Sequence, residues 1–173
     1  MTADPINPSQ ATPTITLHLG ADHTTVVSAG PGAQTSTLLL ALGTTRTAAQ
    51  FFRHAPPTPL ELENAIMAVE DEVIRARSLS FAHAELQTTD AAVRSFAVLA
   101  GVQAAEVMHL PLAAVELQFD LLAALVQGRP ASIAGIPADV EFAATLLILR
   151  EFMHHLQFAQ ISIAQLPPAR PQH

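Results

Sequence analysis

Residues 15–28 constrain the fold most, because they read as two short strands joined by a tight polar turn. Apolar and polar residues alternate over residues 14–19, which is the pattern of a half-buried β-strand. Residues 20–23 form the predicted turn, and the β-branched residues after it favour a returning strand. Glycine and proline interrupt the chain before a third predicted strand at residues 35–42. The chain is therefore expected to begin with an antiparallel meander.

Helix signals follow the meander. Thr58 can cap a helix, Pro59 suits its first turn and Glu61 occupies the capping-box position. Asp90 can cap a later helix with its side chain. Further helices are expected over residues 44–52, over residues 111–127 and from residue 136 onward. Strands are expected over residues 82–87 and 161–164, whereas residues 106–110 are too short to assign. The last helix has an almost wholly apolar interior at residues 142–149, so it is placed at the centre of the domain.

This order of elements predicts a three-layer α/β domain with a mixed sheet flanked by helices. A chain of 173 residues is long enough for one domain with a substantial core. We expect a single domain over residues 14–164. Residues 1–13 are expected to be a disordered N-terminal tail, and residues 165–173 a proline-rich C-terminal tail.

Composition excludes several classes of function. The formal net charge of −7 argues against binding to nucleic acids or anionic membranes, because both require clustered cations. The chain has neither lysine nor cysteine, which excludes Schiff-base, thiolate and disulfide chemistry. Hydrophobic residues make up 50% and charged residues 13%, so a homo-oligomer or a partner protein is expected to cover part of the surface. The sequence contains no signal peptide or long apolar run, and a cytoplasmic location is expected.

Three strings resemble, in the same order, the second actin-like domain of the exopolyphosphatase / guanosine pentaphosphate phosphohydrolase family. They are the hairpin at residues 17–27; Leu-Gly-Thr-Thr-Arg at residues 42–46 with Phe51 and the Pro-Pro-Thr-Pro-Leu-Glu-Leu helix start at 56–62; and Gly-Ile-Pro-Ala-Asp at 135–139 with the apolar helix and residues 158–163. The resemblance implies a ribonuclease H-like, actin-like ATPase fold over most of residues 14–164. It also implies a phosphate-binding loop at the hairpin and a second one near residue 88.

The resemblance supplies the candidate ligand-binding residues, which are the equivalents of the family's phosphate loops. They are Gly20, Asp22, His23, Thr24, Thr25, Arg46, Thr88, Thr89 and Asp90. Arg46 is interpreted either as an anion contact or as a member of an ion pair. Glycine-rich loops bind phosphate because their backbone N–H groups can approach it closely, whereas this chain has Asp22 and Asp90 in place of glycines. The family's other domain, which contributes catalytic residues, has no counterpart in this sequence.

A divalent metal is a further hypothesis, on His18, Asp22 and His23. Imidazole and carboxylate are competent ligands for zinc and similar ions, and these side chains lie within six residues. Polar filling of the turn is the alternative. His154 and His155 are a poor chelating pair, because adjacent residues of a helix point about 100° apart.

The sequence is compatible with two main classes of function. The first is a degenerate exopolyphosphatase-like domain, non-catalytic, that acts in protein interaction or ligand binding. The alternative is a hydrolase or binder of polyphosphate or guanosine pentaphosphate, completed by oligomerisation or by a partner chain. A metal-dependent hydrolase that uses His18 and His23 is a third possibility. Whether the chain is an enzyme stays open at this point, with the non-catalytic class favoured.

Overall fold

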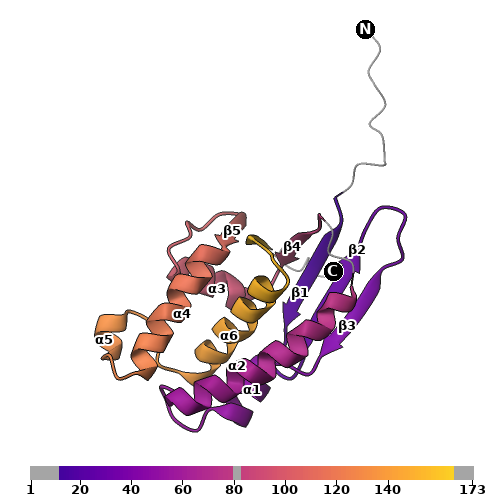
Figure 1. Cartoon of the computed structure of the whole chain (residues 1–173). Helices are drawn as coiled ribbons and strands as arrows, with labels where there is room; N and C mark the ends of the chain where they lie inside the picture. Colours follow the sequence, from indigo (N-terminus) through magenta and orange to yellow (C-terminus); the bar gives the residue numbers. More distant parts are fainter. Residues whose placement is uncertain (1–11, 80–82, 166–173) are drawn as a thin grey trace, which may run out of the picture.

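A computed structural model describes residues 12–79 and 83–165 of the chain (Figure 1). The predicted tails fall almost entirely outside these ranges, as does residue 82 at the start of the fourth predicted strand. The described residues form one mixed sheet and a group of helices. Every helix among them is too short or too polar to cross a bilayer.

The sheet has six strands in the order β3-β2-β1-β4-β6-β5. They are β1 (Thr14–Leu19), β2 (Thr24–Ala29), β3 (Ser36–Leu40), β4 (Glu85–Thr88), β5 (Val107–Pro111) and β6 (Gln160–Ala164). The predicted antiparallel meander is confirmed, because β2 pairs antiparallel with both β1 and β3. β4 is parallel to β1 and to β6, whereas β5 is antiparallel to β6. The ambiguous stretch at residues 106–110 is thus an edge strand.

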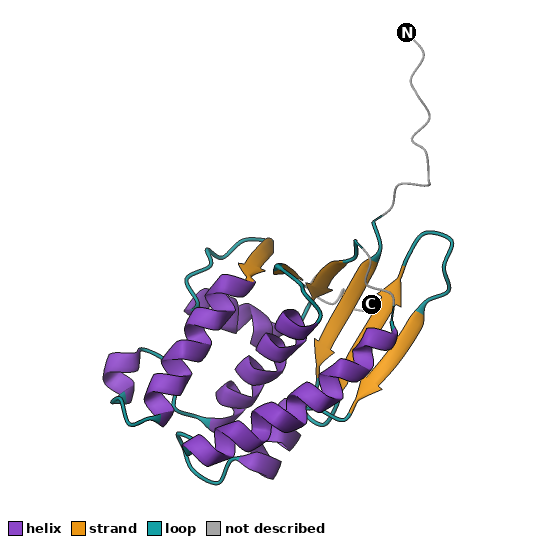
Figure 2. Ribbon diagram, viewed as in Figure 1, coloured by secondary structure: helices purple, strands orange, loops and turns teal. Residues whose placement is uncertain are grey.

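The helices connect these strands. They are α1 (Thr44–Phe51), α2 (Pro59–Ile74), the 3-10 helix η2 (Arg75–Ser78), α3 (Ala91–Leu99), α4 (Leu112–Val126), α5 (Ala131–Ala134) and α6 (Val140–His155). Figure 2 shows them gathered on one side of the sheet. The predicted helices at residues 44–52 and 111–127 are confirmed to within two residues, and α5 and η2 were not predicted.

The start of α2 is fixed by the predicted capping box. The Thr58 hydroxyl accepts a hydrogen bond from the Glu61 N–H at 3.3 Å, and the Glu61 carboxylate accepts one from the Thr58 N–H at 2.9 Å. The His54 ring lies 2.9 Å from the same carboxylate. The backbone bond from Thr58, followed by the bond from His54, lowers the pKa of Glu61 to about 2 from its usual 4.5.

This carboxylate gives the first testable prediction. A group with a lowered pKa stabilises the fold at pH values above its unfolded pKa. The contribution of Glu61 is therefore complete above about pH 4.5 and is lost as the pH falls toward about 2. We expect Glu61→Gln to flatten the decline in melting temperature across this window. Glu63→Gln, on the same helix and exposed, should keep the wild-type slope. Equal slopes for all three proteins would contradict the role of the box.

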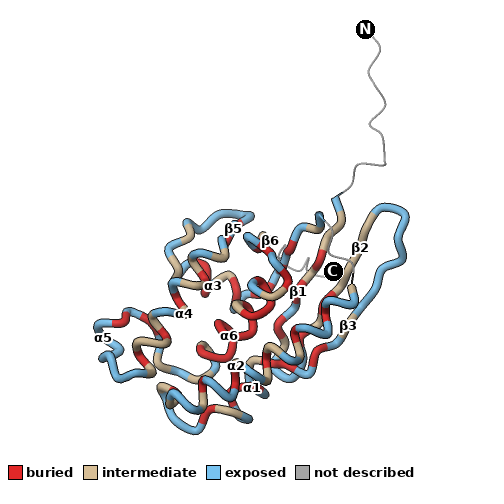
Figure 3. Tube along the Cα trace, in the orientation of Figure 1, coloured by how far each residue is buried: buried red, intermediate tan, exposed pale blue. Residues whose placement is uncertain are grey.

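The core lies between the sheet and the helices. The strand residues that face the helices are buried, among them Ile15, Leu17, Leu86, Leu110, Ile161 and Ile163. α6 is surrounded by α1, α2 and α4, and its residues from 143 to 149 are all buried. Figure 3 shows this concentration of buried residues along α6. The predicted central position of residues 142–149 is confirmed for all but Phe142, which is half-buried.

The opposite side of the sheet is not covered by any described helix. We call it the open face, and it consists of Thr14, Thr16, His18, Thr25, Val27, Ala29, Thr37, Leu39, Glu85, Gln87, Val107, His109, Pro111, Gln160, Ser162 and Ala164. All of these residues are exposed or half-buried. The described helices lie on one face of the sheet for a topological reason. The crossovers from β3 to β4 and from β4 to β6 step in the same direction, and right-handed crossovers then place their helices on the same face.

Candidate functional site

The candidate site lies at the edge of the sheet where β1, β3, β4 and β6 end and where α1, α3 and α6 begin. We call it the carboxyl edge. Ligands of α/β proteins bind at such an edge, because loops and helix N-termini converge there. The hairpin turn at residues 20–23 and the turn at residues 88–90 both lie on it, which the sequence resemblance implied.

The hairpin turn is packed against the first turn of α1. The Thr44 N–H donates to the Gly20 carbonyl oxygen at 3.0 Å, and the Arg46 N–H donates to the Ala21 carbonyl oxygen at 3.0 Å. This approach is close, since a Cβ atom on Gly43 would lie 2.1 Å from the Ala21 carbonyl oxygen. Backbone oxygen atoms of the hairpin therefore satisfy N–H groups at the start of α1.

Two of the candidate hydroxyl groups form buried hydrogen bonds with the backbone. Thr24 is fully buried and its hydroxyl donates to the Leu42 carbonyl oxygen at 2.7 Å. Thr88 is also buried, and its hydroxyl accepts a hydrogen bond from the Asp90 N–H at 3.1 Å. Thr25 is half-buried and Thr89 is exposed, so these two hydroxyl groups are more accessible.

Asp90 joins the two turns. One oxygen of its carboxylate accepts the Leu19 N–H at 2.6 Å, and the other pairs with Nδ1 of His18. Asp90 is 8% exposed, whereas the His18 side chain is 64% exposed. The parallel ladder between β1 and β4 ends at Thr16, so the Leu19 N–H lies beyond it and the carboxylate supplies its partner.

The predicted capping role of Asp90 is wrong. It occupies the N-cap position of α3, but its side chain makes no capping hydrogen bond because it is engaged by β1. Asp139 does cap its helix, accepting the Phe142 N–H at 2.8 Å. Glu141, in the first turn of α6, accepts a hydrogen bond from the Thr45 hydroxyl of α1 at 3.1 Å. Sequence reasoning missed this link between helices. A glutamate in the first turn of a helix is a recognisable signal, because the helix dipole favours an acidic group there.

The structure does not assemble the proposed metal ligands. His18 pairs with Asp90, and no group of three histidine or acidic side chains among the described residues could hold a metal ion. Asp22 and His23 are exposed on the hairpin turn. Arg46 is also exposed, and its side chain forms no ion pair or hydrogen bond within residues 12–79 and 83–165. Within this part of the chain, Arg46 therefore does not form the ion pair that one of its two interpretations requires.

The adjacent histidines lie far from this edge, at the end of α6. His154 pairs with Glu116 at 3.2 Å, and His155 pairs with the buried Glu151 at 2.9 Å. Arg150 completes the cluster: burial lowers its pKa, but hydrogen bonds to Glu116 and Glu151 more than offset this, so its pKa is raised. The cluster is a partnered ionic network between α4 and α6.

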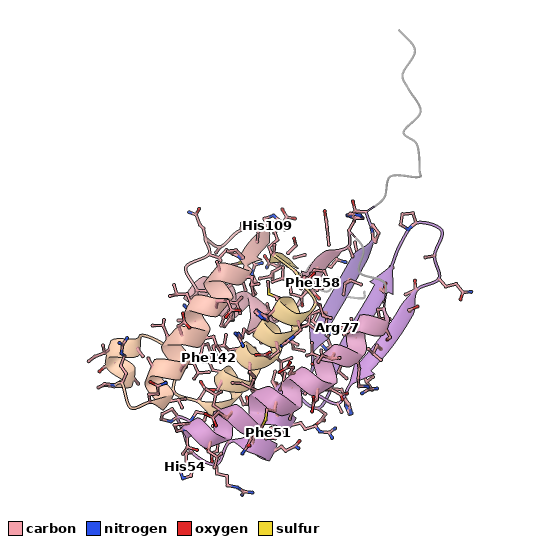
Figure 4. All side chains as sticks on the ribbon, viewed as in Figure 1. Phe51, His54, Arg77, His109, Phe142 and Phe158 are labelled. Atoms are coloured by element: carbon pink, nitrogen blue, oxygen red, sulfur yellow. The ribbon has the colours of Figure 1, made fainter. Side chains whose placement is uncertain are left out.

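A pocket of about 430 Å³ opens beside the carboxyl edge, between α3 and α6. Its lining is mainly apolar and consists of Ala92, Ser95, Phe96, Leu99, Pro137, Glu141, Phe142 and Thr145. Phe142, labelled in Figure 4, lies with its ring centroid 5.9 Å from that of Phe96. Neither the hairpin turn nor residues 88–90 contribute to this pocket, so it does not unite the two candidate loops.

No protein-family model and no curated protein matches the chain. Solved structures do match it. A Ppx/GppA enzyme of Aquifex aeolicus superimposes with a TM-score of 0.68 at 15% identity, covering 88% of this chain and 53% of that chain. The chain has an actin-like exopolyphosphatase fold. An exopolyphosphatase-like protein covers 94% of this chain and 59% of its own, with a TM-score of 0.69 and 13% identity.

An exopolyphosphatase from Cytophaga hutchinsonii gives a TM-score of 0.66 at 12% identity, over 91% of this chain and 55% of that one. The predicted resemblance and the α/β fold class are thereby confirmed at the level of the fold. The chain spans just over half the length of the exopolyphosphatase-type structures that it matches. Their names describe those proteins, and identities of this size carry the fold alone to this chain.

Proposed function

We propose that this actin-like exopolyphosphatase-type domain is non-catalytic and acts by binding a partner. The position of Asp90 is the observation that carries the proposal. Its carboxylate accepts the Leu19 N–H and pairs with His18. An acidic group from the second turn that the resemblance assigns to phosphate therefore contacts the strand that leads into the first. A bound phosphate would compete with this carboxylate for the same donors.

The starts of α1 and α6 at the carboxyl edge are engaged by oxygen atoms of the chain, whereas α3 has no side-chain cap. Carbonyl oxygens of the hairpin accept from the first turn of α1, and the Asp139 carboxylate accepts from the first turn of α6. Two like charges about 4 Å apart repel by about 4 kcal/mol at an effective dielectric constant of 20. Asp22, Asp90 and Glu141 therefore make this edge unfavourable for a polyanion, and Arg46 is the candidate cation that opposes them.

The test is phosphate release from polyphosphate and from guanosine pentaphosphate, with Mg²⁺ present. We expect no release above the protein-free blank, because the Asp90 carboxylate already occupies the Leu19 N–H and His18 Nδ1 at this edge and would repel the reacting phosphate. Thr25→Ala and Arg46→Ala should give the same result as the wild type. Release by the wild type at a rate that either substitution abolishes would overturn the proposal and establish the catalytic alternative.

Binding of a phosphoanhydride without hydrolysis is a second candidate. It is favoured by Arg46 beside the hairpin, which is exposed and has no side-chain partner within residues 12–79 and 83–165. A ligand at about 100 times its dissociation constant stabilises a protein by about 2.7 kcal/mol, which moves the melting temperature of a domain this size by several degrees. The melting temperature measured with and without polyphosphate separates the two candidates. A shift that Arg46→Ala removes supports binding, and no shift supports a protein partner.

A further inference from the structure

We propose that the open face of the sheet is the interface through which two copies of this chain associate. The inference rests on the proposed interaction role and names both its surface and its partner. It uses a face of the sheet that shares His18 and Thr25 with the carboxyl edge but extends across all six strands. Its test measures oligomeric state, so it can fail while the phosphate-release test succeeds, and the reverse is equally possible.

The first argument concerns the parallel centre of the sheet. β4 is parallel to β1 and to β6, and sheets built from parallel strands are usually covered on both faces. Here the helices cover one face, where alternate strand residues are fully buried, and none of the described helices covers the other. His109, labelled in Figure 4, lies on β5 at the top of the view, away from α1 and α2.

The second argument is the distribution of charge. Glu85 is the one open-face residue with a formal charge, although the chain carries 15 acidic and 8 basic residues. No charged residue occurs between residues 24 and 45, a stretch that includes all of β2 and β3. Two copies with a net charge of −7 each repel one another most where acidic residues face each other. The open face is where two such copies can approach with little repulsion.

The third argument is that the face suits its own copy. Its polar side chains are mostly hydroxyl, amide and imidazole groups, which both donate and accept hydrogen bonds. Some are already ordered by cross-strand contacts, such as Gln87 Nε2 to the Thr16 hydroxyl at 2.9 Å and His109 Nδ1 to the Ser162 hydroxyl at 3.1 Å. A symmetric dimer needs such a self-complementary surface.

The size of the face is sufficient. Six strands spaced about 4.8 Å apart and about five residues long form a face of about 29 by 17 Å, so two facing copies bury on the order of 1,000 Å². Leu39 on β3 is 53% exposed and Val107 on β5 is 48% exposed, at the two ends of the sheet. A two-fold axis along the central strands places Leu39 of one copy over Val107 of the other.

Light scattering coupled to size-exclusion chromatography tests the proposal. We expect the wild type to elute as a dimer and the double variant Leu39→Glu/Val107→Glu to elute as a monomer, with an unchanged circular dichroism spectrum because both side chains are exposed. Leu117→Glu is the matched control. Leu117 is 57% exposed on α4, away from the sheet, and its substitution should leave the dimer intact.

Each contrary outcome decides against the proposal. A wild type that stays monomeric up to its solubility limit would show that a different protein, or none, covers the open face. A double variant that remains as dimeric as the wild type would place the interface elsewhere. A dimer disrupted by Leu117→Glu would place it on the helical side.

Discussion

Replacing Phe152 with alanine is expected to destabilise the domain by about 3–5 kcal/mol, the usual cost of deleting a buried phenylalanine ring. Phe152 lies in α6, is fully buried and stacks on Phe158, with ring centroids 6.2 Å apart and planes 1° from parallel. The effect is large because α6 is enclosed by the sheet and by α1, α2 and α4, so neighbouring groups cannot easily fill the cavity. Urea unfolding monitored by circular dichroism measures the loss, which corresponds to a fall in melting temperature of about 10 °C.

Leu117→Ala is the control for Phe152→Ala. Leu117 belongs to α4 and is 57% exposed, so its truncation should change the free energy of unfolding by no more than about 0.5 kcal/mol. The comparison separates loss of the core from loss of any large apolar side chain. A cost below about 1 kcal/mol for Phe152→Ala would mean that α6 is not the centre of the core.

Local signals accounted for much of the fold. The alternation in residues 14–19 predicted β1, and its antiparallel partners followed from the short turns. Thr58, Pro59 and Glu61 predicted the start of α2, because a capping box satisfies backbone N–H groups within one turn of chain. The apolar interior of α6 predicted its burial, since a helix that is apolar on all sides cannot face water.

Long-range pairing set the limit of that reasoning. β5 has only five residues, and it forms an edge strand because β6, more than 50 residues later in the chain, pairs with it. The partner of His18 was sought nearby, in Asp22 or His23, but it is Asp90, 72 residues away. The capping role of Asp90 failed for the same reason. A propensity for the N-cap position does not reveal that a strand end offers a competing donor.

Replacing Gly43 with alanine is expected to destabilise the domain by about 3 kcal/mol, at the upper end for overpacking a tight site. Gly43 has a φ of −134°, which any residue can adopt, so the cost comes from contact and not from backbone strain. An added Cβ would lie 2.1 Å from the Ala21 carbonyl oxygen, which is held in place by the Arg46 N–H. The hairpin turn must therefore move away from α1, and thermal or urea unfolding should register the loss.

Gly30→Ala is the matched control for Gly43→Ala, because both substitutions add one methyl group near a turn of the meander. A Cβ on Gly30 would meet its nearest neighbour, a carbon of Pro13, at 3.7 Å, an ordinary contact, so we expect a change within about 0.5 kcal/mol. Equal effects at the two sites would show that the hairpin is not held against α1. The carbonyl oxygens of Gly20 and Ala21 would then leave the N–H groups of α1 open to an anion. That outcome would weaken the non-catalytic proposal as well, because the proposal relies on these two hydrogen bonds to occupy the N–H groups at the start of α1.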